Sequence, residues 1–270
     1  MSRAQIIDGR ALAARVKDDV KRRVAKLRAA GRAVRLDAIL AGGDGEAASG
    51  AAIYARNQAA TCAELGIEYQ LDELPGSATF KDIAGRVLLA NEDERISAIM
   101  VHLPLPVGVE TERIQSLIAI DKDVEGVNPA NIGNVVYGRR SLVPCTALAV
   151  MEMIESTGVK LPGAVCVCVG ASNIVGKPVA VLLMRAEATV ISTNIHTRNL
   201  PELCRSADVL VTAVGKPNLI TKNMIKPGAV VIDVGISRVK GPNGKTMTVG
   251  DVAFDEVSQT AGWVSPVPAN

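Results

Sequence analysis

Hydrophobic positions near the start of the chain repeat with helical spacing. Between residues 8 and 31 they fall on one face: Leu12, Val16, Val20, Val24 and Leu27. Asp8 precedes this stripe and Gly31 follows it. The pattern therefore predicts a long amphipathic helix with an acidic cap at its start.

The next hundred residues alternate between short apolar runs and helical patterns. Strands are predicted at 34–42, 67–74 and 96–106, and helices at 51–66, 79–93 and 110–119. The small-residue stretch 43–51 is predicted as a loop. This order is typical of parallel strands joined by crossover helices.

A segment rich in Gly, Pro and Asn, residues 121–146, interrupts the alternation and indicates a domain boundary. We expect one domain over residues 1–144 and a second over 145–270. In the second, helices are predicted at 147–158, from about 175, and at 199–207, and strands at 164–170, 188–193, 208–215, 229–235 and near 263–268. The expected fold class is α/β with two domains.

Composition narrows the possible partners. The chain has 270 residues, a net charge of +2 and 2% aromatic residues, so no electrostatic or stacking surface for nucleic acid is expected. No apolar run approaches the length of a membrane span, and the charged N-terminus is not typical of a secretory signal, so we expect a cytoplasmic protein with no membrane partner. Five cysteines without metal-like spacing and two histidines predict buried reduced thiols and no metal site.

The stretch VCVCVGASNIVGKPVAVLL, residues 165–183, reads as a strand, a tight turn and a helix. A helix start after Gly170, Ala171 and Ser172 would present free N–H groups and a dipole that favour a phosphate. Gly170 and Gly176 are six residues apart, whereas the dinucleotide fingerprint has five, so the turn alone also fits a plain strand-to-helix connection.

Eight motifs in order make the chain resemble a known family. They are VHLPLP, DKDVEGVNPANIGN, LVPCT, VGASNIVGKP, AVGKP, GAVVIDVGIS, VGDVAFDEV and SPVP. The chain resembles the bifunctional methylenetetrahydrofolate dehydrogenase/cyclohydrolase family over essentially its whole length.

The resemblance implies an N-terminal α/β domain and a Rossmann-type domain, with folate bound in the cleft between them, and a homodimer. It implies oxidation of 5,10-methylenetetrahydrofolate by NAD or NADP, followed by hydrolysis to the 10-formyl form. The implied residues are Tyr54, Gln58, His102 and Glu125 for catalysis; Gly170, Ala171, Ser172, Ile195 and Ile236 for the dinucleotide; and Tyr54, His102, Glu125 and Pro266 for the substrate.

The chain departs from the family pattern in the folate pocket. The family helix carries Ser-x-x-Tyr-x-x-x-Lys, where this chain has Ala51, Tyr54 and Gln58, and the family glutamine is His102. Two interpretations stay open: the titratable group has moved from the lysine to the histidine, or hydrolysis has been lost. Gln58 is the expected hydrogen-bond partner of His102, and residual hydrolysis would titrate near pH 6.5.

Two further departures affect the ligands. Glu125 replaces the family aspartate that faces the pterin. Ile195 stands where NADP-using members have a serine, whereas Arg198 and His196 favour a phosphorylated ribose, so NAD and NADP both remain open. The family continues beyond the SPVP motif, so we expect that a C-terminal tail is missing from the sequence.

We expect a methylenetetrahydrofolate dehydrogenase with weak or lost cyclohydrolase activity. The alternative is a repurposed folate- or nucleotide-binding relative without dehydrogenase activity.

Overall fold

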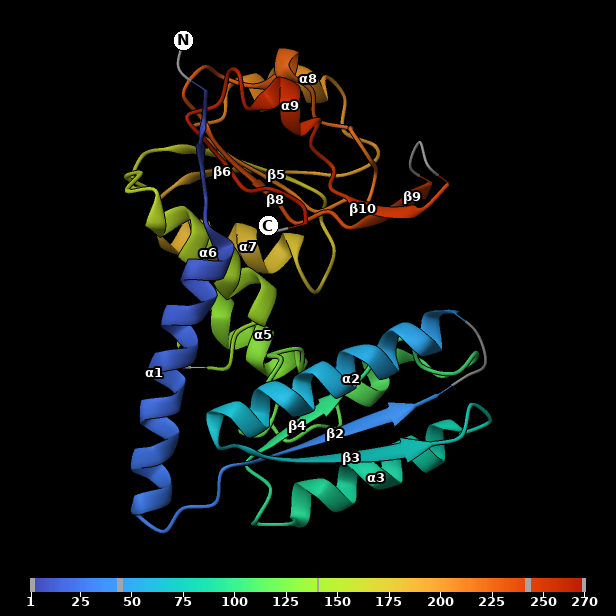
Figure 1. The fold of residues 1–270 in the computed structure, drawn as a ribbon. Helices are drawn as coiled ribbons and strands as arrows, with labels where there is room; N and C mark the ends of the chain where they lie inside the picture. The colour runs from blue at the N-terminus through green and yellow to red at the C-terminus, as the bar shows by residue number, and fades with distance from the viewer. Residues whose placement is uncertain (1–2, 43–45, 140, 241–243, 269–270) are drawn as a thin grey trace. The chain divides into compact units, whose positions relative to one another are not determined.

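The computed structural model describes residues 3–42, 46–139, 141–240 and 244–268. The chain forms two compact units (Figure 1). One comprises Arg15–Val143, and the other combines Met1–Ala14 with Pro144–Asn270. In this division the first 14 residues of the predicted first domain pack with the second unit, and the break at Val143–Pro144 lies next to the predicted boundary. Strand β1 (Gln5–Ile6) pairs in parallel with β11 (Trp263–Val264), and two residues are too few to produce a recognisable pattern.

The unit Arg15–Val143 contains a parallel three-stranded sheet. Its order is β3 (Glu68–Leu74), β2 (Arg35–Ala41) and β4 (Ala98–Val101). Helices α2 (Glu46–Leu65) and α3 (Phe80–Glu92) cover opposite faces (Figure 1). Ile39 packs with Ile83 and Val87 of α3, whereas Ala38 packs with Cys62 of α2. This period of two confirms the crossover arrangement that the sequence predicts.

Helix α1 (Gly9–Ala29) starts where expected, because the Asp8 carboxylate accepts a hydrogen bond from the Ala11 N–H at 2.9 Å. Its apolar stripe is only partly covered. Val24 is buried, but Val16 and Leu27 remain 48% and 41% exposed.

Three boundaries in this unit differ from the predictions. Helix α2 begins at Glu46, so the loop predicted at 43–51 is wrong from that residue onward, and residues 43–45 lie outside the described residues. Helix α4 spans only Thr111–Gln115. Helix α5 (Pro129–Val136) lies in the segment predicted as loop, where the Asn128 side chain accepts from the Ala130 N–H at 2.8 Å.

The other unit is a Rossmann-type layer with six parallel strands in the order β1-β11-β8-β7-β5-β6. The four longer ones are β5 (Val165–Val169), β6 (Thr189–Thr193), β7 (Val209–Thr212) and β8 (Val230–Asp233). Helices α6 (Cys145–Ser156) and α7 (Gly176–Arg185) cover one face, and α8 (Leu200–Arg205), η1 (Lys222–Met224) and α9 (Phe254–Val257) cover the other (Figure 1).

The apolar strands 188–193 and 208–215 are both expected at the edge of this sheet, where they would need cover, but only the first lies there. Strand β6 is an edge strand, but β7 pairs with both β5 and β8 and is interior. An antiparallel pair, β9 (Ser237–Lys240) and β10 (Thr246–Val249), adds a hairpin that the sequence pattern did not reveal.

All five cysteines are free thiols, and four of them are buried; Cys145 is exposed, contrary to the expectation for it. Burial raises the pKa of Cys166 to about 11 and that of Cys168 to about 12. In the part of the chain that the structure describes, no group of three or more potential metal ligands comes together. Within the same residues, no helix combines the length and apolarity needed to cross a membrane.

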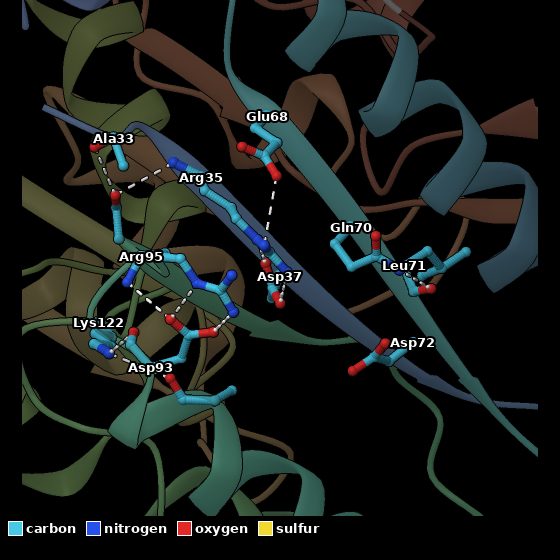
Figure 2. A network of polar contacts seen from close by, with 12 residues as sticks. Ala33, Arg35, Asp37, Glu68, Gln70, Leu71, Asp72, Asp93, Arg95 and Lys122 are labelled. Atoms are coloured by element: carbon cyan, nitrogen blue, oxygen red, sulfur yellow. Dashed lines mark hydrogen bonds and ion pairs between the residues drawn. The ribbon is translucent and has the colours of Figure 1, made fainter. Parts of the chain in front are cut away.

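Charged side chains form two groups of contacts, one that links β2 to β3 and one at the end of α3 (Figure 2). Arg35 donates from Nε and a terminal nitrogen to the two Asp37 oxygens at 2.6 and 2.9 Å, and a further nitrogen lies 3.5 Å from Glu68. The Arg35 and Asp37 side chains are 18% and 6% exposed, but the Glu68 side chain is 66% exposed. Lys122 donates to three backbone carbonyls at the end of α3, those of Ala90, Asn91 and Asp93.

We predict that Asp37→Asn destabilises the unit Arg15–Val143 by about 3 kcal/mol, because it leaves a mostly buried guanidinium without its bidentate partner. Glu68→Gln is the matched control on the same arginine, and its effect should be much smaller because this carboxylate is solvated. Urea unfolding followed by far-ultraviolet circular dichroism measures both. Equal effects of the two substitutions would contradict the prediction.

Candidate active site

Helix α2 and the end of β4 bring two of the predicted residues, Tyr54 and His102, into contact. Tyr54 and Gln58 are one turn apart on α2, and His102 follows β4, where its N–H donates to the Ile39 carbonyl at 2.8 Å. The rings of Tyr54 and His102 meet edge to face, with centroids 5.8 Å apart at 78°. The His102 side chain is buried, whereas Tyr54 is 57% exposed.

The expected pairing of Gln58 with His102 is wrong. The Gln58 amide nitrogen lies 2.9 Å from the Met100 sulfur, and its carbonyl oxygen is buried with no hydrogen-bond partner among the residues described. Nε2 of His102 instead lies 3.4 Å from the Tyr69 hydroxyl. Tyr69 is on β3, so the polar contact of the His102 ring is with the sheet and not with helix α2.

Burial keeps this cluster uncharged. It lowers the pKa of His102 and raises the pKa of Tyr69 to about 12. At neutral pH one ring nitrogen of His102 carries a proton and the other accepts. A titration of His102 is therefore expected below pH 6.5, not at it.

Glu125 is positioned by the buried turn that precedes α5. The Asp123 carboxylate accepts hydrogen bonds from the Val127 N–H, the Asn128 N–H and the Asn131 amide at 2.7 to 3.2 Å. Burial, and secondarily the negative charge of Asp123, raise the pKa of Glu125 to about 7. Its carboxyl group therefore changes charge in the physiological range, which is typical of functional sites.

In the other unit, the turn after β5 has the backbone geometry of a phosphate cradle. Gly170 has φ of 109°, and a β-carbon there would lie 2.5 Å from the Ala213 carbonyl oxygen. A β-carbon on Gly176 would collide with the carbonyl of Gly170. Only glycine fits at both positions, because backbone carbonyl groups fill the space that a side chain would need, and this close packing of strand, turn and helix is typical of dinucleotide-binding turns.

The idea that the start of α7 offers free N–H groups needs a correction. The Ser172 hydroxyl accepts from the Val175 and Gly176 N–H groups at 3.2 and 3.3 Å, and its carbonyl accepts from Lys177 at 3.0 Å. Ser172 therefore caps the helix itself. Within the described ranges, the N–H groups of Ala171 and Ser172 in the turn itself have no hydrogen-bond acceptor.

The remaining predicted residues lie around the same sheet edge. Ile195 follows β6 and is 94% exposed, in a turn closed by Asn194 and Thr197. Ile236 and Pro266 line one cavity of about 360 Å³, together with apolar groups such as Met153 of α6. Pro266 thus accompanies a predicted dinucleotide residue, and it belongs to a different unit from Tyr54, Gln58, His102 and Glu125.

Sequence reasoning missed two residues of these sites. Tyr69 shares a face of β3 with Ile67 and Leu71, and this alternation could have placed it on the α2 side of the sheet. Asp251 is completely buried behind the loop that follows β7, and its contacts come from residues distant in sequence. It stands in the VGDVAFDEV motif, but the motif alone does not indicate these contacts.

Comparisons with known proteins identify the chain's relatives. A family model described as the tetrahydrofolate dehydrogenase/cyclohydrolase catalytic domain matches residues 7–125, and that of the NAD(P)-binding domain matches residues 144–270. The bifunctional protein FolD of Moorella thermoacetica is 43% identical over 98% of this chain and 92% of its own length.

Two solved structures have the same fold. One is the bifunctional FolD enzyme of Campylobacter jejuni, with 35% identity, a TM-score of 0.92, and coverage of 99% of this chain and 92% of that chain. The other is the Trypanosoma brucei methylenetetrahydrofolate dehydrogenase-cyclohydrolase in complex with NADP and an inhibitor, with 35% identity, a TM-score of 0.92, and coverage of 100% and 92%. This chain belongs to the tetrahydrofolate dehydrogenase/cyclohydrolase family.

Proposed function

We propose that this protein oxidises 5,10-methylenetetrahydrofolate with NAD or NADP and that its cyclohydrolase activity is weak or lost. The observation that carries the second part is Gln58. At the position of the family lysine it cannot titrate, its amide nitrogen faces the Met100 sulfur, and its buried carbonyl oxygen is unpaired in the described part of the chain.

Dehydrogenation survives such a change because hydride transfer requires orientation and exclusion of water, not a protein base. The bound nicotinamide supplies the hydride-accepting carbon. Ala171 and Ser172 would hold its phosphates through backbone N–H groups at the turn that Gly170 opens, since the Gly170 N–H itself donates to the Thr193 carbonyl at 3.1 Å. Ile236 would contact the nicotinamide end from the cavity that it shares with Pro266. On the folate side, the exposed face of Tyr54 would orient the ring system and Glu125 would bind the pterin.

Hydrolysis makes a different demand, since water must be deprotonated and the bridge nitrogen protonated. His102 is the titratable group beside Tyr54, but it is buried and its Nε2 is turned toward Tyr69. Its lowered pKa also weakens it as a base. The position beside Tyr54 therefore lacks an efficient proton carrier, which favours the interpretation that hydrolysis is weak or lost.

We predict that decay of 5,10-methenyltetrahydrofolate with this protein stays within about tenfold of the uncatalysed rate, because a missing acid–base group typically costs about 10²–10⁴ in rate. Stopped-flow absorbance measures the decay. Gln58→Lys should accelerate it about a hundredfold.

Gln58→Met is the control for this experiment, since it fills the site without a titratable group and should leave decay slow. If Gln58→Lys is inactive, the double variant with His102→Gln rebuilds the family pair and tests whether the imidazole obstructs the lysine. Parent hydrolysis at the rate of its dehydrogenase would contradict the proposal.

Glu125 gives folate binding a predicted pH dependence. The free carboxyl has its pKa raised to about 7. A pterin that donates N–H groups binds the carboxylate, so affinity should fall as pH drops below about 7, by up to about tenfold per unit. Isothermal titration of tetrahydrofolate between about pH 6 and 8 measures this.

Glu125→Gln should bind more weakly and lose the slope, whereas His102→Gln should keep it. A flat profile in the parent protein would show that the carboxyl group does not meet the pterin.

We further propose a homodimer formed through the NAD(P)-binding unit. Edge strand β6 pairs only with β5, and its other side offers unpaired backbone groups that proteins usually cover. Light scattering at micromolar concentration should yield about twice the chain mass of 28.2 kDa. A mass equal to that of one chain would contradict the dimer.

One assay separates the dehydrogenase from a binder without activity. Formation of NADH or NADPH is followed spectrophotometrically after addition of methylenetetrahydrofolate, with both oxidised dinucleotides in parallel. Ile195 is apolar and exposed, which does not favour NADP, whereas Arg198 nearby in sequence does, so the assay also determines the preferred dinucleotide.

A further inference from the structure

The loop after β7 forms one wall of the Gly170 turn. The Ala213 N–H donates to the Val169 carbonyl at 2.8 Å, which extends the pairing of β5 and β7 by one residue. The Ala213 carbonyl oxygen is the atom that a β-carbon at Gly170 would meet at 2.5 Å. The width of the phosphate cradle therefore depends on where residues 213–216 lie.

A single buried carboxylate fixes this loop. Asp251 has no exposed surface. One of its oxygens accepts from the Thr212 hydroxyl at 2.9 Å and from the Val214 N–H at 2.7 Å, and the other accepts from the Lys216 N–H at 2.7 Å. Two backbone donors two residues apart thus converge on one carboxylate, which defines the path of the loop between them.

Asp251 also contacts the segment that carries Ile236. A β-carbon on Gly235 would collide with the Asp251 carboxylate, so only glycine at position 235 leaves room for this carboxylate. The Ser237 hydroxyl then donates to the Gly215 carbonyl at 3.0 Å and ties the two segments together. Ile236 lies between these fixed points and is 72% exposed toward the solvent.

The Asp233 carboxylate fixes the backbone at Asp251. Its two oxygens accept from the Asp251 N–H at 3.1 Å and the Val252 N–H at 2.9 Å, and one also accepts from the Gly235 N–H at 2.9 Å. Both carboxylates are therefore surrounded by N–H or O–H donors, which compensate for their burial.

We propose that Asp251 is a positioning residue for the dinucleotide: it holds residues 213–216 and 235–236 where the phosphates and the nicotinamide end require them. The inference rests on the proposed placement of the dinucleotide at the Gly170 turn. It assigns to this carboxylate control over dinucleotide affinity without direct contact with the ligand.

The test is Asp251→Asn, which has nearly the same shape. An amide offers one acceptor oxygen and one NH₂ group, so in either orientation it opposes a donor of the loop with another donor. The dissociation constant for the better-bound of NAD+ and NADP+, measured by isothermal titration, should rise about tenfold or more. The KM for the dinucleotide should rise in parallel, while the KM for methylenetetrahydrofolate and kcat change less than about twofold.

Two controls accompany this variant. Asp255→Asn alters a carboxylate in the same segment whose side chain is 93% exposed, and dinucleotide affinity should not change. Thr212→Val removes one of the three donors and should weaken binding about threefold. If Asp251→Asn does not fold, as judged by thermal unfolding, Thr212→Val decides the question.

A folded Asp251→Asn protein with parental dinucleotide affinity would overturn the positioning role and leave the proposed site intact. So would a fall in unfolding temperature without any change in affinity, which is what a purely structural role produces. A parent protein that binds neither dinucleotide would overturn the proposed site together with this inference.

Discussion

The contact between the Gly170 carbonyl and Gly176 is the constraint on which the dinucleotide unit depends. Without side chains at these positions, the end of β5 and the start of α7 approach more closely than any other residue pair would permit. The same approach brings the Ala213 peptide against the turn and leaves only a narrow range of positions for the loop after β7. The Ser172 hydroxyl then accepts hydrogen bonds from the N–H groups at the start of the helix, so the N–H groups left for the proposed phosphate site belong to the turn and not to the helix. Packing, capping and ligand geometry are therefore consequences of one backbone approach.

The folate pocket shows how a change at one position alters its surroundings. Replacing a lysine by Gln58 removes a charge, and the amide that remains turns toward a thioether instead of the neighbouring imidazole. His102 then relies on Tyr69, a residue of the sheet, and the cluster of two tyrosines, an imidazole and an amide carries no formal charge at neutral pH. In the same unit, burial raises the pKa of Glu125 to about 7. In the proposed assignment of roles, the group that titrates near neutrality therefore stands at the pterin-binding position and not at the ring-opening one.

Sequence periodicity predicted what local physics determines. The strand faces, the cap at Asp8 and the order of helices and strands follow from side-chain spacing, and the two-domain α/β fold is confirmed. Errors arose where a long-range contact decides the outcome. Strand β1 exists because β11 offers it a partner, β7 is interior because β8 pairs on its far side, and Gln58 turns to Met100 because α2 packs there. The start of α5 was a missed local signal, since Asn128 followed by proline is a common helix start.

The pairing of β1 with β11 has a consequence for the order in which the chain assembles. Residues 5 and 6 leave the ribosome first, yet their partners at 263 and 264 are among the last of this sequence to be made. The unit Arg15–Val143 is uninterrupted in sequence, so it can fold during synthesis before the partners of residues 5 and 6 have been made. Closing the six-stranded sheet is then a late, entropically expensive event, because it joins distant parts of the chain. In chain order, the unit Arg15–Val143 lies between the two segments of the other unit, so removal of the first segment would remove strand β1 from the six-stranded sheet.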